Sequence, residues 1–230
     1  DADDVEDITS ICGGLNINIG TLNKNTIPSM FLAGKKANEL GHIVLLDPVG
    51  AGASRLRTDT ANRLMQEVRF DAVRGNISEI KTLCTGSGST KGVDADAVDA
   101  VTEANLDDGV QLVKTFAQRA GCIVAVTGAI DLVSDGERCW CIRNGRAEMS
   151  RITGTGCQLS ALMTAFLVAN PDHKLAAAAA AVCMMGLAGE IGWANMQPGD
   201  GNSTYRNRII DAIFNMTGDA LEEGAKYELR

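Results

Sequence analysis

The chain has 230 residues, of which 45% are hydrophobic, and this is enough to build a full buried core. Its formal net charge of -8 and pI near 4.8 argue against nucleic acid or an anionic membrane surface as a partner, because no basic block offsets the acidic residues. A small-molecule partner is expected instead. The seven cysteines are odd in number and lack a disulfide framework spacing, which predicts reduced thiols in a cytoplasmic protein.

Apolar runs alternate with helical patterns along most of the chain. The expected strands are 15–19, 43–47, 72–74 and 122–127, and the helices among them are 28–40, 58–69, 77–83 and 106–120, with a Gly/Ser loop at 85–92. Strands 132–134 and 139–142, joined by Asp135-Gly136, are typical of a hairpin. The remaining expected elements are helices at 156–169, 174–193 and 206–224.

This alternation predicts an α/β fold, with a mostly parallel central sheet covered by helices on both faces. No linker composition interrupts the pattern, so one domain over residues 1–230 is expected. The longest apolar stretch runs from Leu175 to Gly189 and stops at Glu190, short of a membrane span. It predicts a buried helix whose small residues suit close packing, in the core or across a subunit boundary.

In sheets of this kind the ligand lies beyond the carboxyl ends of the strands. Those ends are rich in glycine and polar residues, at 18–21, 47–52, 74–76 and 127–128. A further segment, Gly154-Thr155-Gly156-Cys157, opens an apolar helix. Glycines there let backbone amides approach a phosphate at the positive end of the helix, which predicts a phosphoryl-transfer site. An ordinary tight turn also uses this glycine pattern, so the prediction of a phosphoryl-transfer site needs support from other segments.

Four segments in this order resemble the hydroxyethylthiazole kinases, members of the ribokinase-like superfamily: Asp47-Pro-Val-Gly, Arg74-Gly-Asn-x-x-Glu79, Val126-Thr-Gly and Gly154-Thr-Gly-Cys157. Segments 16–22 and 199–201 are also similar to that family. Cys157 is the distinguishing residue, because other members of the superfamily usually carry aspartate there.

The resemblance implies a kinase that transfers the γ-phosphoryl group of ATP to the hydroxyl of 4-methyl-5-(2-hydroxyethyl)thiazole, a step in thiamine salvage. It also implies a requirement for Mg²⁺ and a homotrimer with sites between subunits. The family carries a further segment before the position of Asp1, which contributes to the thiazole pocket. We therefore expect part of that pocket to be missing from this sequence.

The backbone amides of Gly154, Thr155 and Gly156 are expected to form an anion hole for the moving phosphoryl group. Cys157 is expected to accept the proton of the acceptor hydroxyl, and its place at a helix N-terminus favours the thiolate. The same residue also fits a buried structural thiol. By resemblance, Gly154 also contacts the thiazole.

The remaining site residues are expected at the strand ends. Arg74 is predicted to face the nucleotide phosphates, and Asp47 is predicted to serve the magnesium or phosphate site. The resemblance assigns a metal-holding role to Glu79, but Asn76 and Glu79 also have the spacing of a helix-capping box. The other expected contacts are Thr127 and Asn76 for ATP, and Asn18 and Gly20 for the thiazole pocket.

Three alternative functions stay open from the sequence. Another ribokinase-like kinase, for hydroxymethylpyrimidine or pyridoxal, shares the same strand ends. An ATP- or ADP-dependent NAD(P)-hydrate dehydratase shares the superfamily, although Cys157 argues against it. The third alternative is a phosphate-binding regulatory module without catalysis.

Overall fold

The computed structural model describes residues 1–85 and 100–230. Seven strands in the described part form one sheet, in the same order as they follow along the chain. The first four pair in parallel, and from β4 to β7 each strand pairs antiparallel with the next. Their bounds are β1 Gly14–Asn18, β2 Ile43–Asp47, β3 Ala72–Asn76, β4 Ile123–Thr127, β5 Asp131–Ser134, β6 Cys139–Ile142 and β7 Tyr227–Leu229.

The α-helices are α1 Val5–Ser10, α2 Thr26–Leu40, α3 Arg55–Glu67, α4 Ile77–Thr85, α5 Leu106–Ala120, α6 Thr155–Ala169, α7 Lys174–Ala194, α8 Asn202–Asn215 and α9 Gly218–Gly224. Short 3-10 turns lie at Glu103–Asn105, Ala147–Arg151 and Pro171–His173. The predicted loop at 85–92 falls almost wholly outside the described residues. Only Thr85 is described there, and it is the last residue of α4.

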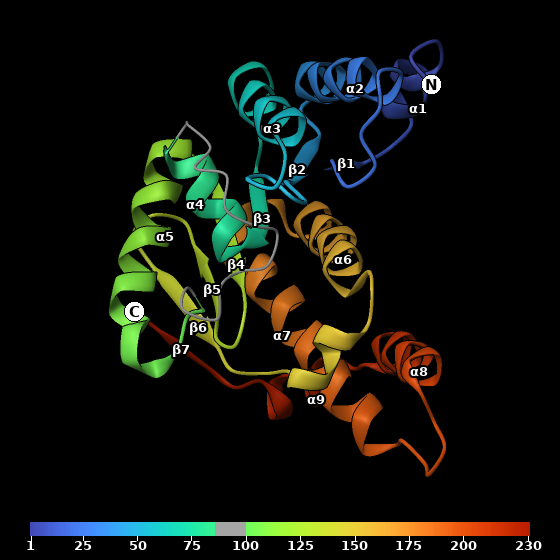
Figure 1. The fold of residues 1–230 in the computed structure, drawn as a ribbon, viewed down its shortest axis with the longest axis vertical. Coiled ribbons are helices and arrows are strands. Elements are labelled where there is room, and N and C mark those ends of the chain that lie inside the picture. The colour runs from blue at the N-terminus through green and yellow to red at the C-terminus, as the bar shows by residue number, and fades with distance from the viewer. Residues whose placement is uncertain (86–99) are drawn as a thin grey trace.

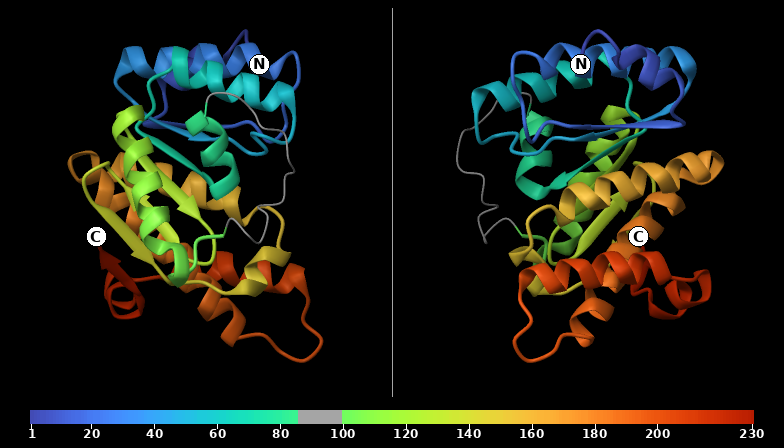
Figure 2. Two further views of the ribbon diagram at one scale, coloured as in Figure 1. Left: turned by 60° about the vertical axis from the view of Figure 1, so that its left-hand side comes forward. Right: turned by 90° about the vertical axis from the view of Figure 1, so that its right-hand side faces the viewer.

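The sheet lies between two helical layers (Figures 1 and 2). Strand β2 shows why, since all five of its residues are buried and successive side chains point to opposite faces. Val44 and Leu46 join a core cluster that also contains side chains from α2 to α5. Ile43 and Leu45 join a second cluster with side chains from α6, α7 and α8. The prediction of an α/β sheet with a parallel core and helices on both faces is confirmed.

The C-terminal part differs from its prediction. The helix expected at 206–224 is two helices, α8 and α9, and the chain then returns to the sheet as β7. Met216 has an extended backbone, and the Thr217 side chain accepts a hydrogen bond from the Ala220 amide, 3.2 Å away, which starts a new helix. Strand β7 has three residues and pairs with β6, so its sequence carries too short a signal for prediction.

The helix predicted at 174–193 is α7, and it is a core helix. By length and composition the segment Pro171–Ala194 does meet the criteria for a membrane span, contrary to the expectation that it is too short. Most of it, however, is buried inside the protein. Its small residues serve contacts within the chain, since a Cβ added at Gly186 would lie 2.7 Å from the Asn144 backbone.

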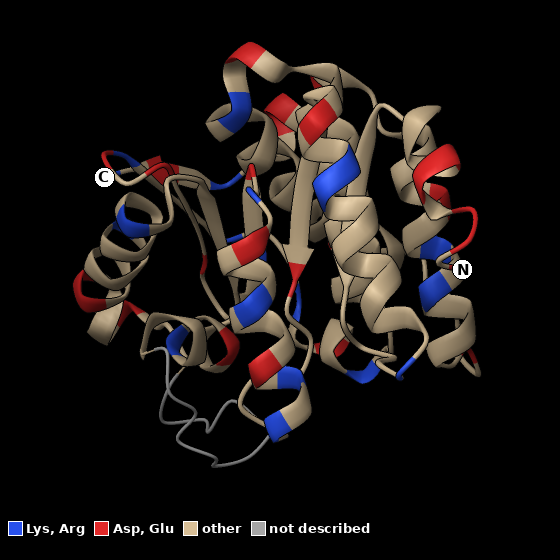
Figure 3. Cartoon of the chain, turned by 90° about the horizontal axis from the view of Figure 1, so that it is seen from above, with Lys and Arg blue, Asp and Glu red and all other residues tan. Residues whose placement is uncertain are grey.

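Charged residues of both signs are interspersed over the outer helices in the view of Figure 3. Several form ion pairs within one helix, for example Arg55 with Asp59 and Arg63 with Glu67. Fewer charges lie close to the strands. Two of these, Asp47 and Arg74, mark the site described next.

Candidate active site

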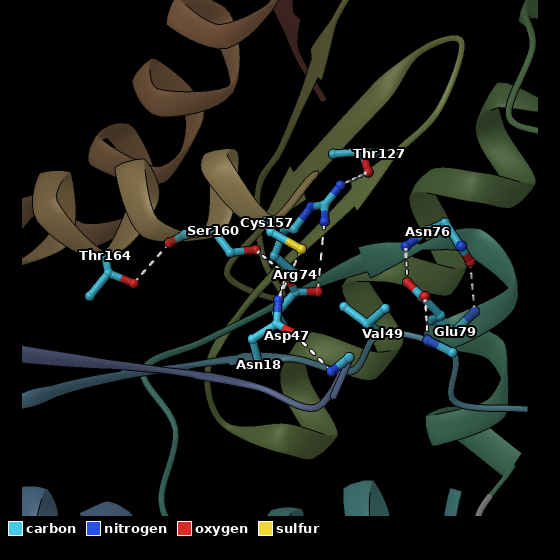
Figure 4. A network of polar contacts seen from close by, with 12 residues as sticks. Asn18, Asp47, Val49, Arg74, Asn76, Glu79, Thr127, Cys157, Ser160 and Thr164 are labelled. Carbon is cyan, nitrogen blue, oxygen red and sulfur yellow. Dashed lines mark hydrogen bonds and ion pairs between the residues drawn. The ribbon is translucent and has the colours of Figure 1, made fainter. Parts of the chain in front are cut away.

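The carboxyl ends of the four parallel strands bring four predicted side chains together (Figure 4). Asn18 ends β1 and Asp47 ends β2, and the two residues are register partners. Arg74 lies on β3, and Thr127 ends β4. Helix α6 begins over the same edge and adds Cys157, as expected where a helix starts above such a sheet.

Asp47 is the most buried of these residues, with no exposed surface. Its Oδ2 atom accepts hydrogen bonds from Asn18 Nδ2 at 2.8 Å and from Ser160 Oγ at 2.9 Å. Its Oδ1 atom has no hydrogen-bond partner and lies 3.7 Å from Arg74 Nη1. Burial raises the pKa of Asp47, and the charge of Arg74 opposes that rise. The carboxyl is thus held in place by one oxygen while the other faces Arg74.

The Asn18 side chain links Asp47 to Cys157. Its Oδ1 accepts a hydrogen bond from the Gly20 amide at 2.8 Å, and this fixes which way the amide group points. Its Nδ2 donates to Asp47 and also to Cys157 Sγ at 3.1 Å. Because the same NH₂ group donates to Asp47 and to Cys157, Asn18 orients the sulfur from the end of β1. Asn18 and Gly20, predicted as pocket residues, are therefore joined in one turn at the site.

Arg74 faces the start of α6. Its Nη2 donates to Thr127 Oγ1 at 2.6 Å, and a Cβ added at Gly156 would lie 2.6 Å from its Nη1. A guanidinium beside a helix N-terminus places two positive groups together, and an anion between them is favoured. The arrangement suits a phosphate group, as the sequence predicts, with Thr127 holding the arginine.

Helix α6 presents its first amides at this point. Gly154 is the N-cap residue with φ of 96°, a left-handed conformation that favours glycine. The amide of Gln158 donates to the Gly154 carbonyl at 2.9 Å, so the amides of Thr155, Gly156 and Cys157 precede the first turn's hydrogen bonds. Cys157 is exposed. The start of α6 thus brings together an exposed sulfur, the free amides of its first turn and Arg74.

Alanine at Gly156 and at Gly154 is expected to act through different contacts. Gly156→Ala should raise the KM for the ATP expected from the sequence by about tenfold, since the new methyl group displaces the Arg74 guanidinium from the place where it is predicted to contact the phosphates. Its melting temperature should also fall, because displacing the guanidinium moves the nearby cation away from buried Asp47, and this outweighs the gain in helix propensity of alanine over glycine. Gly154→Ala is the comparison for stability: nothing lies near its added Cβ, but its left-handed φ costs about 1–2 kcal/mol. Thermal unfolding and ATP kinetics measure both, and an unchanged KM in Gly156→Ala would contradict the placement of Arg74.

Asn76 and Glu79 form the predicted capping box at the start of α4. Asn76 Oδ1 accepts from the Glu79 amide at 2.9 Å, and Glu79 Oε2 accepts from the Asn76 amide at 2.8 Å. The other oxygen, Oε1, accepts from the Gly50 amide at 2.8 Å. Glu79 is buried, and this raises its pKa, while the two backbone hydrogen bonds oppose the rise. The carboxylate therefore fixes the loop after β2 beside the site.

Two residues of the site were not identified from the sequence. Ser160 is fully buried one turn after Cys157 and donates to Asp47. A polar residue at helical spacing within an apolar helix is the signal that points to it. Asp131 accepts from the Gly128 amide at 2.8 Å and so shapes the turn after Thr127. Desolvation raises the pKa of Asp131 to about 7, against the effect of Arg74.

A parallel-core sheet with a glycine-rich helix start, a guanidinium and an exposed cysteine at its carboxyl edge is the arrangement expected of a small-molecule kinase of the ribokinase-like class. The solved structures agree on the fold. A Staphylococcus aureus pyridoxal kinase in complex with ADP matches at a TM-score of 0.62 and 16% identity, over 99% of this chain and 77% of that one. A hydroxyethylthiazole kinase protein from Pyrococcus horikoshii OT3 matches at 0.85 and 29%, over 99% and 81%.

Sequence comparison gives the family. The hydroxyethylthiazole kinase family model matches residues 1–219. A hydroxyethylthiazole kinase of Clostridium acetobutylicum is 54% identical over 228 residues, which are 99% of this chain and 84% of that protein. One of Ruminiclostridium cellulolyticum is 45% identical, over 98% and 81%. The chain belongs to the hydroxyethylthiazole kinase family, and its activity is that of a phosphotransferase in thiamine biosynthesis.

Proposed function

We propose that the chain transfers the γ-phosphoryl group of ATP to the hydroxyl of 4-methyl-5-(2-hydroxyethyl)thiazole through the site built around Cys157. The observation that carries the proposal is the exposed sulfur at the start of α6, hydrogen-bonded to Asn18 beside Asp47 and Arg74. The family and relatives support the choice of acceptor.

Each residue has a distinct role in this proposal. Cys157 accepts the proton of the acceptor hydroxyl, and the oxygen then bonds to the γ-phosphorus as the bond to ADP breaks. The α6 amides of Gly154, Thr155 and Gly156 bind the moving phosphoryl group. Arg74, Thr127 and Asn76 serve ATP, and Asn18, Gly20 and Gly154 serve the thiazole side of the pocket.

Magnesium is proposed to bind at Asp47 and, directly or through water, at Glu79. Asp47 Oδ1 is buried and free of hydrogen bonds, and each Glu79 oxygen accepts one amide, so both retain acceptor capacity. Within residues 1–85 and 100–230, no group of three or more His, Cys, Asp or Glu is placed to hold a metal ion. ATP phosphates and water would complete the shell, as is usual for Mg²⁺. The ion would neutralise phosphate charge during transfer.

A substrate panel tests this proposal against the alternatives. ADP formation from ATP is measured with the thiazole alcohol, hydroxymethylpyrimidine, pyridoxal and a hydrated nicotinamide nucleotide, each with and without Mg²⁺. Turnover with the thiazole alcohol and Mg²⁺ is expected. Turnover with another compound alone would transfer the function to that class, and none with any compound would favour a non-catalytic phosphate-binding module.

The proposed assembly is a homotrimer with sites between subunits. Its support is the family resemblance, together with two apolar side chains one turn apart on α8, Ile210 and Phe214, which are 46% and 87% exposed. Light scattering at micromolar concentration should therefore give three times the chain mass of 24.2 kDa. A mass equal to one chain would contradict the trimer.

We also propose a cytoplasmic location and one domain over residues 1–230. All seven cysteines are free, as suits a reducing compartment. The single sheet in the described residues begins near one end of the chain and ends near the other, in support of one domain.

A further inference from the structure

Arg57 lies in the first turn of α3, and its side chain contacts the loops that follow β1 and β2 at the site. Its Nη2 donates to the Gly20 carbonyl at 2.9 Å, and its Nη1 donates to the Val49 carbonyl at 3.4 Å. Gly20 follows β1 and Val49 follows β2, so one planar group connects the two loops. Its backbone is held as well, since the Arg57 amide donates to the Ser54 side chain that caps α3.

The contact with the second loop is close. Gly50 has φ of 75°, and a Cβ added there would lie 2.3 Å from Arg57 Nη1. The Gly50 amide in turn donates to Glu79 Oε1. The guanidinium therefore packs directly on the loop that Glu79 also holds.

On the first loop, the Arg57 contact leads to the sulfur in three steps. Arg57 holds the Gly20 carbonyl, and the Gly20 amide holds Asn18 Oδ1. Asn18 Nδ2 then donates to Asp47 and Cys157. A shift of Gly20 would rotate the Asn18 amide and change the position of the sulfur.

Arg57 differs from the other arginines of α3 in the kind of partner that its side chain contacts. Arg55 pairs with Asp59 and Arg63 pairs with Glu67, as surface arginines commonly do. In the described ranges no carboxylate lies within 4.0 Å of the half-buried Arg57, and its partners are two backbone carbonyls. A rigid fork of donors holds two carbonyls in a way that the single ammonium of lysine does not.

We propose that Arg57 is a positioning residue for the phosphoryl transfer. It holds the loops after β1 and β2 at a fixed separation and, through Asn18, sets the orientation of Cys157. The proposal rests on the function proposed above for Cys157. No contact with substrate is assigned to Arg57 itself.

The test compares Arg57→Ala and Arg57→Lys with Arg55→Ala, a control on the same helix that removes only a surface ion pair. The kcat of Arg57→Ala should fall by about tenfold to a hundredfold, the scale of a small misplacement at a reacting centre. The KM for ATP should change little. Arg57→Lys should lose less, and added methylguanidinium should restore part of the kcat of Arg57→Ala.

A second readout does not depend on turnover. Iodoacetamide alkylation is followed at Cys157 by mass spectrometry, with exposed Cys12 of the same molecule as internal reference. The ratio of the two rates should change in Arg57→Ala and stay at the parent value in Arg55→Ala. This ratio tests the link from Arg57 to the sulfur even if the thiazole alcohol is not the substrate.

The proposal is overturned if the kcat and alkylation ratio of Arg57→Ala equal those of Arg55→Ala. It is also overturned if kcat falls only in proportion to the folded fraction, with the ratio unchanged. Should Arg57→Ala fail to fold, the same two readouts on Arg57→Lys decide it.

Discussion

Replacement of Cys157 by alanine is expected to lower kcat by about two to four orders of magnitude, the usual scale of general-base catalysis. The KM for ATP should change much less, because the α6 amides and Arg74 remain. Cys157→Asp should retain activity, since a carboxylate is ionised at neutral pH and also accepts a proton. Its permanent charge near the γ-phosphate opposes ATP binding, so the KM for ATP should rise.

Cys12→Ala is the control, because Cys12 is also exposed but lies between α1 and β1. Steady-state kinetics on the three variants separate proton transfer from binding. If Cys157→Ala turned over at the parent rate, the proton-acceptor role would be wrong, and the helix amides alone would carry the catalysis.

Replacement of Arg74 by alanine is expected to raise the KM for ATP by about tenfold to a hundredfold, which corresponds to the loss of a hydrogen bond to a charged group. The KM for the thiazole alcohol should change less. The variant also leaves buried Asp47 without its nearby cation, so the pKa of Asp47 should rise further and the protein should lose stability.

Arg74→Lys separates charge from geometry. Lysine keeps the positive charge near Asp47 but lacks the fork that reaches Thr127 as well. We therefore expect it to recover most of the stability and only part of the ATP affinity. Thermal unfolding and kinetics for both substrates measure the two effects. Parent values of KM and kcat for ATP in Arg74→Ala would remove this residue from the nucleotide site.

Local sequence determined the elements and the local contacts of the site. Strand β2 was predicted with the observed bounds, because a short apolar run that ends at Asp-Pro is typical of a buried strand. Helix α5 was also predicted with its bounds, and Gly121 follows its last residue in the left-handed conformation. The Asn76–Glu79 box was visible because its partners are three residues apart.

The tertiary structure alone decided how distant residues meet. Asn18 and Cys157 are 139 positions apart, and Ser160 and Asp47 are 113 apart. Such contacts follow from the order of the strands and from the point where α6 starts above the sheet. The hydrophobic periodicity of a short segment carries no information about either. The buried helix predicted at 174–193 is confirmed as α7, but its length and composition also fit a membrane span, and its packing inside the protein decides between the two. Sequence patterns report neighbours along the chain, whereas the polar network that orients Cys157 exists only after the sheet has formed.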